Sequence, residues 1–375
     1  MKIKSAVLRK SGAFKPYEDT KPIKIENLYL DPPKKDEVLV KIKAASLCHS
    51  DLSVINGTRP RPTPMSLGHE ASGVVEKVGE NVDEFETGDK VVCVFVPSCG
   101  TCLSCREGRP ALCTLGADAN NKGTLLSGGV RLSKGNENIN HHLGVSAFSE
   151  YAVINKNSLI KVNSNIPYDK LALFGCAVIT GVGAVTNTAN IKFGSSVAIV
   201  GLGGVGLSAL LGAVASGASR IVALDINDDK LEYAKSLGAT EVFNSSEENI
   251  IDYIKNKLNG GVDYAFETAG VIEAMNVAYG ITRLGGTTIT TGLPDPKSVF
   301  SLPYVSLTAE EKSLKGSYVG SCVPQRDIPR FISLYQQGKL PINKLHTDTI
   351  QLEDINEGFD KLERGDALRI VVDLE

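Results

Sequence analysis

Four cysteines, Cys99, Cys102, Cys105 and Cys113, lie in one short stretch with the spacing C-x2-C-x2-C-x7-C. Thiolates this close together in sequence are typical of a shared metal ion. Four soft sulfur donors suit a tetrahedral zinc with no open coordination position. Such a zinc holds a loop together and performs no reaction. The stretch therefore predicts a structural zinc, and any chemistry must lie elsewhere in the chain.

The bulk composition is that of a globular protein in a reducing compartment. A length of 375 residues predicts two domains, and 42% hydrophobic with 22% charged residues is ordinary. The first residues, MKIKSAVLRKSG, lack the apolar run of a signal peptide. Eight cysteines with metal-like clustering fit the cytoplasm better than a disulfide framework. We therefore expect a cytoplasmic protein.

Charge and hydropathy argue against two classes of partner. The formal net charge of −3 and the absence of long Lys or Arg runs predict no nucleic-acid partner. Two uncharged runs, residues 171–191 and 193–219, have the length of a membrane span. Because the runs contain several glycines or polar residues such as Thr180, they are better interpreted as buried strand and helix. We expect no membrane partner.

The fold is expected to be α/β, with a β-rich first part. Residues 38–46, 71–80 and 89–97 are short, rich in Val and Ile, and bounded by turn residues, which predicts strands. Residues 116–140 are rich in Gly, Asn and Ser and are expected to form a long surface excursion.

From about Ile179 onward, strand-like and helix-like segments alternate, beginning with VAIVG, GLSALLGAVASG and RIVALDI. This alternation predicts βαβ units and a parallel, doubly wound sheet. After Ser321 the chain returns to two helical segments, IPRFISLYQQGKL and INEGFDKLERG, and a last strand, LRIVVDL. That tail could rejoin the first domain.

A glycine-rich motif, GLGGVG, follows the predicted strand VAIV and begins a helix. It fits G-x-G-x-x-G at Gly201, Gly203 and Gly206, with Gly204 and Val205 between. The first glycine permits a tight turn, the second lets backbone approach a pyrophosphate, and the third allows close helix packing. The helix N-terminus offers free N–H groups to phosphate. The motif predicts a dinucleotide site.

Asp225 ends the next predicted strand and indicates which dinucleotide is bound. A carboxylate at this point accepts hydrogen bonds from both ribose hydroxyls of NAD and repels the 2′-phosphate of NADP. No arginine lies in the five residues that follow, Ile226 to Lys230. We therefore expect NAD.

The remaining cysteines and histidines include candidates for a second metal. Cys48, His69 and Cys176 would supply two thiolates and an imidazole, which suits a catalytic zinc with one exchangeable position. Each residue alone could equally be a buried packing residue, because free cysteine behaves as a small hydrophobe. Sequence spacing does not show that the three converge.

Several motifs together resemble the zinc-dependent medium-chain alcohol dehydrogenases. The order GHEASGVVEKVGENV, the four-cysteine cluster and GLGGVG followed by Asp225 matches this family, and CHSD, GRPALC and FSEY fit as well. The segment between Cys113 and FSEY is that of the family's long form. The resemblance implies a GroES-like catalytic domain over residues 1–177 and 321–375, around a Rossmann domain over 178–320.

The resemblance also implies two zinc sites. The catalytic zinc falls on Cys48, His69 and Cys176, with Glu70 behind the metal and able to exchange onto it. The structural zinc falls on the four clustered cysteines. Cys93 and Cys322 match no ligand position and are interpreted as packing residues.

In this family, zinc acts as a Lewis acid that lowers the pKa of a bound alcohol, so that hydride can pass to the nicotinamide. Ser50 matches the hydroxyl that takes the alcohol proton. Ser53 occupies the position of the usual relay histidine, so proton exit is expected through water or His49. His49 stands where many relatives place an arginine against the pyrophosphate, which predicts looser, more pH-sensitive coenzyme binding.

Further roles carried over from the family concern the coenzyme and the substrate. Thr180 and Val205 would back the nicotinamide, Lys230 would flank the adenosine ribose, and Arg369 would contact a phosphate. Phe95 falls at a wall of the substrate pocket and favours primary alcohols with apolar chains or rings over polyols. The expected activity is interconversion of such alcohols and aldehydes with NAD.

Other classes account for less of the chain. The glutathione-dependent formaldehyde dehydrogenase branch usually has threonine at Ser50, and zinc-free quinone or enoyl reductases lack the ligand set. A zinc-ribbon module would leave GLGGVG and Asp225 unexplained, and the last cysteine gap of seven residues differs from the three of the usual bacterial ferredoxin run. A non-catalytic relative would not need intact Cys48, His69, Cys176 and Ser50. Long-form members are mostly homodimers joined through their Rossmann sheets, near GGTTITTGL here, although a tetramer is possible.

Overall fold

A computed structural model describes all residues, 1–375, as two compact units. One unit contains residues 1–176, 323–329 and 343–375, and the other contains 177–322 and 330–342. The sequence placed residues 1–177 and 321–375 in one domain and residues 178–320 in the other. The C-terminal part is divided, however, because residues 330–342 group with the second unit and their side chains Phe331, Leu340 and Ile342 are buried.

The first unit contains a small closed barrel and a larger sheet. The barrel has the strand order β1-β2-β7-β8-β4. Its strands are β1 (Lys2–Leu8), β2 (Ile23–Leu30), β4 (Met65–Ser66), β7 (Leu132–Lys134) and β8 (Glu137–His141). Alternate residues of β1 and β2 enclose one of the apolar cores, as the period of a half-buried strand requires.

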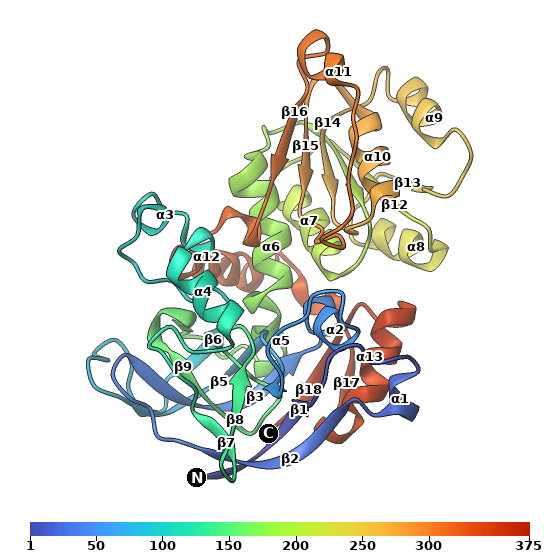
Figure 1. Cartoon of the computed structure of the whole chain (residues 1–375). Helices are drawn as coiled ribbons and strands as arrows, with labels where there is room; N and C mark the ends of the chain where they lie inside the picture. Colours follow the sequence, from blue (N-terminus) through green and yellow to red (C-terminus); the bar gives the residue numbers. More distant parts are fainter. The chain divides into compact units, whose positions relative to one another are not determined.

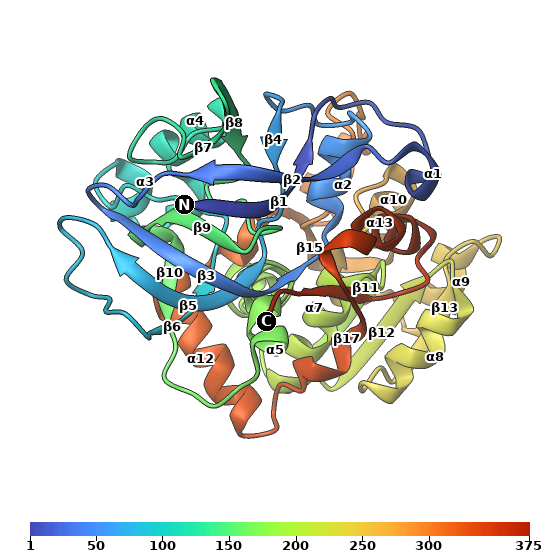
Figure 2. The same ribbon diagram turned by 90° about the horizontal axis from the view of Figure 1, so that it is seen from below.

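The larger sheet has the order β10-β6-β5-β3-β18-β17, with β9 paired to β3. The strands are β3 (Glu37–Ser46), β5 (Ala71–Val78), β6 (Lys90–Cys93), β9 (Tyr151–Asn155), β10 (Leu159–Lys161), β17 (His346–Ile350) and β18 (Arg369–Asp373). Figure 2 shows β3, β5 and β6 side by side in this sheet. The last strand, β18, runs antiparallel to β3. The predicted return of the C-terminal tail to the first domain is therefore confirmed at β18.

The helices of the first unit are short. They are α1 (Tyr17–Thr20), α2 (His49–Ile55), α3 (Leu103–Arg106), α4 (Thr114–Lys122), α5 (Tyr168–Ala172) and α13 (Ile355–Arg364). A longer helix, α12 (Pro324–Gln336), follows the second unit in sequence. Gly123 and Gly365 end α4 and α13 in the left-handed conformation, which glycine adopts without steric cost.

The prediction that residues 116–140 form a surface excursion is wrong. Helix α4 continues to Lys122, and β7 and β8 form a hairpin that closes the barrel. Leu125, Leu132 and Ile139 are buried in its core. Only a few apolar residues of this segment pack into the core, and they are separated by glycines and asparagines. The segment therefore lacks the alternation of apolar and polar residues that predicts a strand.

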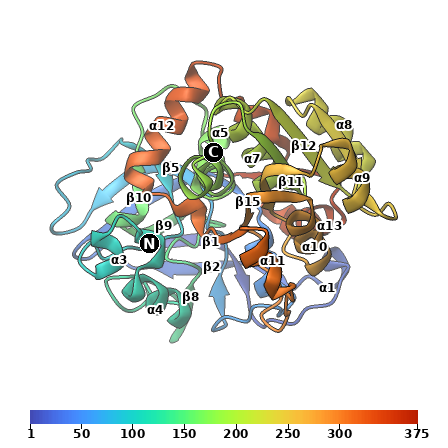
Figure 3. The same ribbon diagram turned by 90° about the horizontal axis from the view of Figure 1, so that it is seen from above.

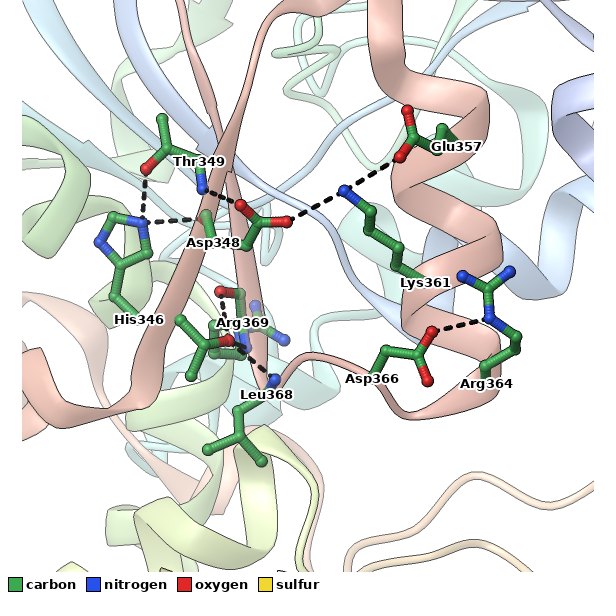
Figure 4. A network of polar contacts seen from close by, with 10 residues as sticks. His346, Asp348, Thr349, Glu357, Lys361, Arg364, Asp366, Leu368 and Arg369 are labelled. Atoms are coloured by element: carbon green, nitrogen blue, oxygen red, sulfur yellow. Dashed lines mark hydrogen bonds and ion pairs between the residues drawn. The ribbon is translucent and has the colours of Figure 1, made fainter.

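Strand β17 and helix α13 are joined by polar contacts that Figure 4 shows. Lys361 Nζ of α13 lies 3.4 Å from Asp348 of β17 and 3.0 Å from Glu357 one turn away. His346 Nε2 lies 2.9 Å from both the Asp348 carbonyl and the Thr349 hydroxyl. The Lys361–Asp348 contact joins the helix to the edge strand of the larger sheet, and the His346 contacts lie within that strand.

The second unit is built on one six-stranded parallel sheet with the order β13-β12-β11-β14-β15-β16 (Figure 1). Its strands are β11 (Ser196–Val200), β12 (Arg220–Asp225), β13 (Glu241–Asn244), β14 (Val262–Glu267), β15 (Thr282–Thr290) and β16 (Ser313–Gly316). The predicted doubly wound parallel sheet is therefore confirmed.

The helices of this unit are α6 (Ala177–Gly183), α7 (Gly204–Ala215), α8 (Asp228–Ser236), α9 (Ile250–Lys257), α10 (Ile272–Ile281) and α11 (Tyr304–Ala309). Figure 3 shows α8 beside β12 and α9 next to α10. Asn227 caps α8 by accepting a hydrogen bond from Lys230 N, and Asp228 and Asp229 complement the helix dipole in its first turn.

No single helix in the chain is both long and apolar enough to cross a membrane. One bent pair, residues 168–175 and 177–189, passes on length and composition together, with a 53° angle between its parts. Most of its apolar side chains are buried within the protein, as in a core helix.

Candidate zinc centres and dinucleotide motif

The four clustered cysteines converge on one point. One sulfur from each of Cys99, Cys102, Cys105 and Cys113 lies within 4.8 Å of the other three. Helix α3 and the turn at Pro110–Leu112 bend the chain back so that the last cysteine meets the first three. The spacing predicted this site, and the donor set fits a closed tetrahedral zinc.

Backbone donors favour the thiolate form at two of these sulfurs, Cys99 and Cys113. Cys102 N lies 3.3 Å from Cys99 Sγ, while Cys99 N and Gly116 N each lie 3.3 Å from Cys113 Sγ. The Thr101 hydroxyl, followed by backbone N–H groups, lowers the pKa of Cys99 to about 6. Gly116 permits this approach, because a Cβ there would stand 1.8 Å from the Pro97 carbonyl.

A second cluster contains the three ligands that the resemblance implied. Ligand atoms of Cys48, His69, Glu70 and Cys176 all lie within 4.8 Å of one another, and all four residues are buried. Cys48 precedes α2, His69 and Glu70 lead into β5, and Cys176 follows the short helical turn after α5. The convergence left open by spacing alone is therefore observed.

The cluster contains a polar atom that no group of the protein satisfies. His69 Nε2 is completely buried and has no hydrogen-bond partner. A buried nitrogen without a hydrogen bond lowers the stability of the folded state by about 1–3 kcal/mol. Such atoms are therefore rare in folded proteins, and an ion that binds the nitrogen would account for this one. Two thiols and a free imidazole nitrogen are the donors that zinc prefers. The residues present therefore fit a zinc ion.

The titration of this cluster is also that of a metal site. A hydrogen bond from Cys176 lowers the pKa of Cys48 well below its ordinary value and raises that of Cys176. Burial alone would lower the pKa of His69, but the charges of Asp51 and Cys48 raise it to about 10. Three groups thus compete for protons around a site that a divalent cation would neutralise.

Two residues around the cluster come from other elements. Arg369 of β18 forms a buried ion pair with Glu70, which leaves the Arg369 Nε without a partner. The Phe95 ring packs edge-on against the His69 imidazole, with centroids 5.2 Å apart. Cys93 and Cys322 lie outside both clusters and are buried.

Sequence reasoning missed two residues beside His69. Asp51, within the CHSD motif, lies 3.0 Å from His69 Nδ1 and 2.9 Å from His142 Nδ1. All three side chains are buried. The carboxylate three residues after Cys48 was a usable signal for Asp51. No local signal pointed to His142, because only the fold brings it to Asp51.

The three residues assigned to proton transfer lie on α2, directly after the candidate ligand Cys48. His49 is exposed, while Ser50 and Ser53 are half-buried. The Ser53 hydroxyl donates a hydrogen bond of 2.8 Å to the His49 carbonyl. Their roles remain predictions.

The glycine motif has the predicted conformation. Gly201 has φ +95°, where side chains are strained, and a Cβ on Gly206 would stand 1.9 Å from the Gly201 carbonyl. Gly203 has open space where its Cβ would point, just before α7 begins with Gly204 and Val205. These are the turn, packing and approach positions of a dinucleotide loop.

Other predicted coenzyme residues belong to the second unit. Asp225 ends β12, where its carboxylate accepts hydrogen bonds from Leu202 N at 2.6 Å and Asn227 N at 3.0 Å. Lys230 is half-buried on α8, and Thr180 is buried in α6. The coenzyme contacts of these side chains remain predictions.

Comparisons with known proteins agree with this architecture. Residues 34–164 match the family described as alcohol dehydrogenase GroES-like domain, and residues 204–337 match the family described as zinc-binding dehydrogenase. The chain is similar along its whole length to three solved structures. An alcohol dehydrogenase zinc-binding domain protein from Burkholderia ambifaria is 35% identical, with a TM-score of 0.94 over 100% of this chain and 99% of that one.

Benzyl alcohol dehydrogenase from Acinetobacter calcoaceticus is 34% identical, with a TM-score of 0.93 and full coverage of both chains. An alcohol dehydrogenase from Thermus sp. ATN1 is 25% identical, with a TM-score of 0.83 over 99% of this chain and 100% of that one. The motifs, the two clusters and these matches agree, and the chain belongs to the zinc-dependent medium-chain alcohol dehydrogenases.

Proposed function

We propose that this alcohol oxidoreductase interconverts primary alcohols and aldehydes with NAD, using one catalytic and one structural zinc. The observation that carries the proposal is the buried cluster of Cys48, His69 and Cys176 around the unpartnered His69 Nε2. When bound there, zinc would supply a Lewis acid that lowers the pKa of an alcohol oxygen.

The chain's own residues then handle the proton. Ser50, two residues after Cys48, has a hydroxyl that can accept the alcohol proton while donating its own. Ser53 donates to the His49 carbonyl, so its hydroxyl hydrogen is already used. We therefore assign the next step to His49, which is exposed, or to solvent. Glu70, paired with Arg369, holds negative charge beside the ligands.

NAD is proposed over NADP because of Asp225. Its two oxygens already hold the backbone N–H groups of Leu202 and Asn227, which fixes the carboxylate at the end of β12. A 2′-phosphate would meet this fixed negative charge.

Asp225→Ser should raise the KM for NAD and lower the KM for NADP. Lys230→Gln, which removes a neighbouring cation, should weaken the binding of both coenzymes alike. Unchanged coenzyme preference in the Asp225 variant would contradict the assignment. Thr180, Val205 and Arg369 are proposed as further coenzyme contacts.

The proposed substrates are primary alcohols with apolar chains or aromatic rings. Phe95 brings an aromatic ring within 5.2 Å of the His69 ring, so an apolar surface borders the proposed metal position. The relative from Acinetobacter calcoaceticus, named for benzyl alcohol, favours aromatic members of this class. Phe95→Ala should raise the KM for aromatic alcohols more than that for ethanol.

We propose a homodimer formed through β16 in a reducing compartment such as the cytoplasm. This edge strand pairs only with β15, and all four of its residues are exposed. Exposed Tyr304 and Val305 of nearby α11 add apolar surface. Unpaired edges invite pairing with another chain. Light scattering would test this, because Leu314→Lys should give a monomer if β16 forms the interface.

The first experiment measures NADH formation with aliphatic and aromatic primary alcohols before and after chelation, together with the zinc content. Chelator-sensitive turnover with two zinc ions per chain would support the whole proposal. Turnover that survives removal of both ions would point instead to a zinc-free reductase of the same superfamily. A single zinc ion retained in His69→Asn, with turnover lost, would assign the catalytic site.

A further inference from the structure

His142 has no role in the reaction as proposed, yet it is buried beside the metal ligand His69. Its side chain is 1% exposed. Its Nδ1 lies 2.9 Å from one oxygen of Asp51, and the His69 Nδ1 lies 3.0 Å from the other. The two Nδ1 atoms and the Asp51 Oδ2 make no hydrogen bond of full geometry, and these short distances are their polar contacts. One buried carboxylate therefore lies between two imidazoles.

The hydrogen positions of this trio follow from its geometry, because the Nδ1 atoms of both rings face the Asp51 carboxylate. A carboxylate can only accept a hydrogen bond, so an imidazole nitrogen that bonds to it must carry a hydrogen. The hydrogen of His142 must therefore be on Nδ1, and that of His69 as well.

This arrangement orients the metal ligand. With its hydrogen on Nδ1, His69 presents the lone pair of Nε2 to Cys48 and Cys176. Asp51 can fix the ring only if the carboxylate is itself fixed. Its Oδ1 accepts from Gly68 N at 3.1 Å and faces His142, while its Oδ2 faces His69.

The backbone at His142 is built to hold this position. Leu143 and Ser146 have φ of +51° and +57°, which is unusual for residues with a side chain. Ser146 Oγ accepts from His142 N at 2.9 Å and donates to the Ser66 carbonyl at 2.9 Å. The His142 ring also packs edge-on against the His69 ring, with centroids 5.5 Å apart. Strained backbone of this kind persists where the surroundings over-determine it.

We infer that His142 is a positioning residue for the zinc ligand His69, acting through Asp51. The inference rests on the proposed catalytic zinc at Cys48, His69 and Cys176. His142 does not touch the metal or the substrate in this scheme. It donates Nδ1–H to Asp51, and the fixed carboxylate sets the tautomer and the angle of the His69 ring. Partners of this kind typically change metal affinity about 10–100-fold.

The test compares His142→Phe, which has no donor, with His142→Asn, whose amide nitrogen takes the place of Nδ1. His142→Gln is the matched control, because its amide lies one bond further out. Zinc release from the full-length protein is followed with a chromogenic chelator. The four-cysteine site in the same molecule serves as an internal reference.

We expect His142→Phe and His142→Gln to release one of the two zinc ions about tenfold faster or more. His142→Asn should stay near the wild-type rate, and release from the four-cysteine site should be unchanged in all three. Cobalt in the faster site should give a shifted visible spectrum in the Phe and Gln variants alone. If His142→Phe does not fold, the zinc release rates of His142→Asn and His142→Gln still test the inference.

Equal release rates for wild type, Asn and Gln variants would overturn the inference and leave the proposed function intact. Faster release of both zinc ions would also overturn it, because it would indicate general destabilisation. Wild-type protein could also bind a third metal ion that His142→Phe does not bind. That result would overturn the inference, because Asp51, His69 and His142 would then form a metal site. Wild-type protein with only the four-cysteine zinc would instead remove the proposed function and the inference together.

Discussion

Arg369, near the end of the chain, forms a buried ion pair with Glu70, the residue after the proposed zinc ligand His69. The Arg369 side chain is 4% exposed and the Glu70 side chain is fully buried. The pair connects β18 to the segment that carries His69. The C-terminal strand therefore contributes to the surroundings of the proposed metal site as well as to the sheet.

Glu70→Ala should destabilise the protein by about 3–5 kcal/mol, because it leaves the guanidinium buried without its carboxylate. Urea unfolding in excess zinc measures the change. The double variant Glu70→Gln/Arg369→Met, which removes both charges, should be more stable than Glu70→Ala. A single variant within about 1 kcal/mol of wild type would mean that the pair is solvated in solution.

Substitution by alanine should lower the stability of the protein at one glycine of the dinucleotide loop and leave it unchanged at another. In Gly206→Ala the new Cβ would meet the Gly201 carbonyl at 1.9 Å and Thr268 Oγ1 at 2.7 Å, so we expect a loss of about 1–3 kcal/mol. In Gly203→Ala nothing lies within 4 Å of the Cβ, and stability should stay near wild type.

The coenzyme separates the two roles. Gly203→Ala should weaken NAD binding about tenfold, or 1.4 kcal/mol, because its methyl group takes the space proposed for the pyrophosphate. Thermal unfolding and NAD titration of the two variants supply the measurements. Normal NAD affinity in Gly203→Ala would place the phosphates elsewhere.

Much of the second unit could be predicted from sequence. VAIV, RIVALD and VDYAFE are short, mainly apolar strands separated by segments of helix length, and both patterns are local properties of the chain. The four-cysteine site was equally visible, since its ligands are close in sequence. The glycine motif followed from its place between strand and helix.

The parts that could not be predicted depend on contacts between distant residues. Nothing near Cys176 shows that it meets Cys48, and only the family resemblance suggested it. His142 lies close to Asp51 because the hairpin of residues 132–141 precedes it and packs into the barrel. The sequence did not predict this hairpin, because its few buried side chains are separated by polar ones. The division of α12 between the two units likewise depends on which core its later residues enter.

Removal of the four-cysteine zinc should unfold a local segment and spare the other metal. Around this site the exposed Leu103, Leu112 and Leu115 contribute little to a core, so the metal carries much of the local stability. Cys105→Ser should retain one zinc, show a lower Tm and be cut faster by protease within residues 99–115.

Cys93→Ala is the matched control for this experiment, since Cys93 lies outside both clusters and burial raises the pKa of its thiol to about 12. It should retain two zinc ions and the wild-type cleavage rate. Loss of both zinc ions from Cys105→Ser would show that the two sites fold as one unit.

His141 should make stability fall as pH is lowered from neutral. This buried imidazole accepts a hydrogen bond of 3.0 Å from Arg131 N, so it must be neutral at Nε2. Burial, and then the charge of Arg131, lowers its pKa to about 3. In the unfolded chain the pKa is about 6.5. Between these values the unfolded state binds more protons, so its contribution to stability is present above pH 6.5 and is lost towards pH 3.

The expected size follows from the two pKa values. At pH 5 the unfolded His141 is protonated and the folded one is not, which costs about 2 kcal/mol relative to neutral pH. His141→Gln keeps an acceptor for Arg131 N and does not titrate. Urea unfolding at pH 7, 6 and 5, in saturating zinc, should therefore show the wild type losing about 2 kcal/mol more than the variant. Parallel losses would mean that His141 is protonated in the folded protein, and the hydrogen bond from Arg131 N could then not form at Nε2.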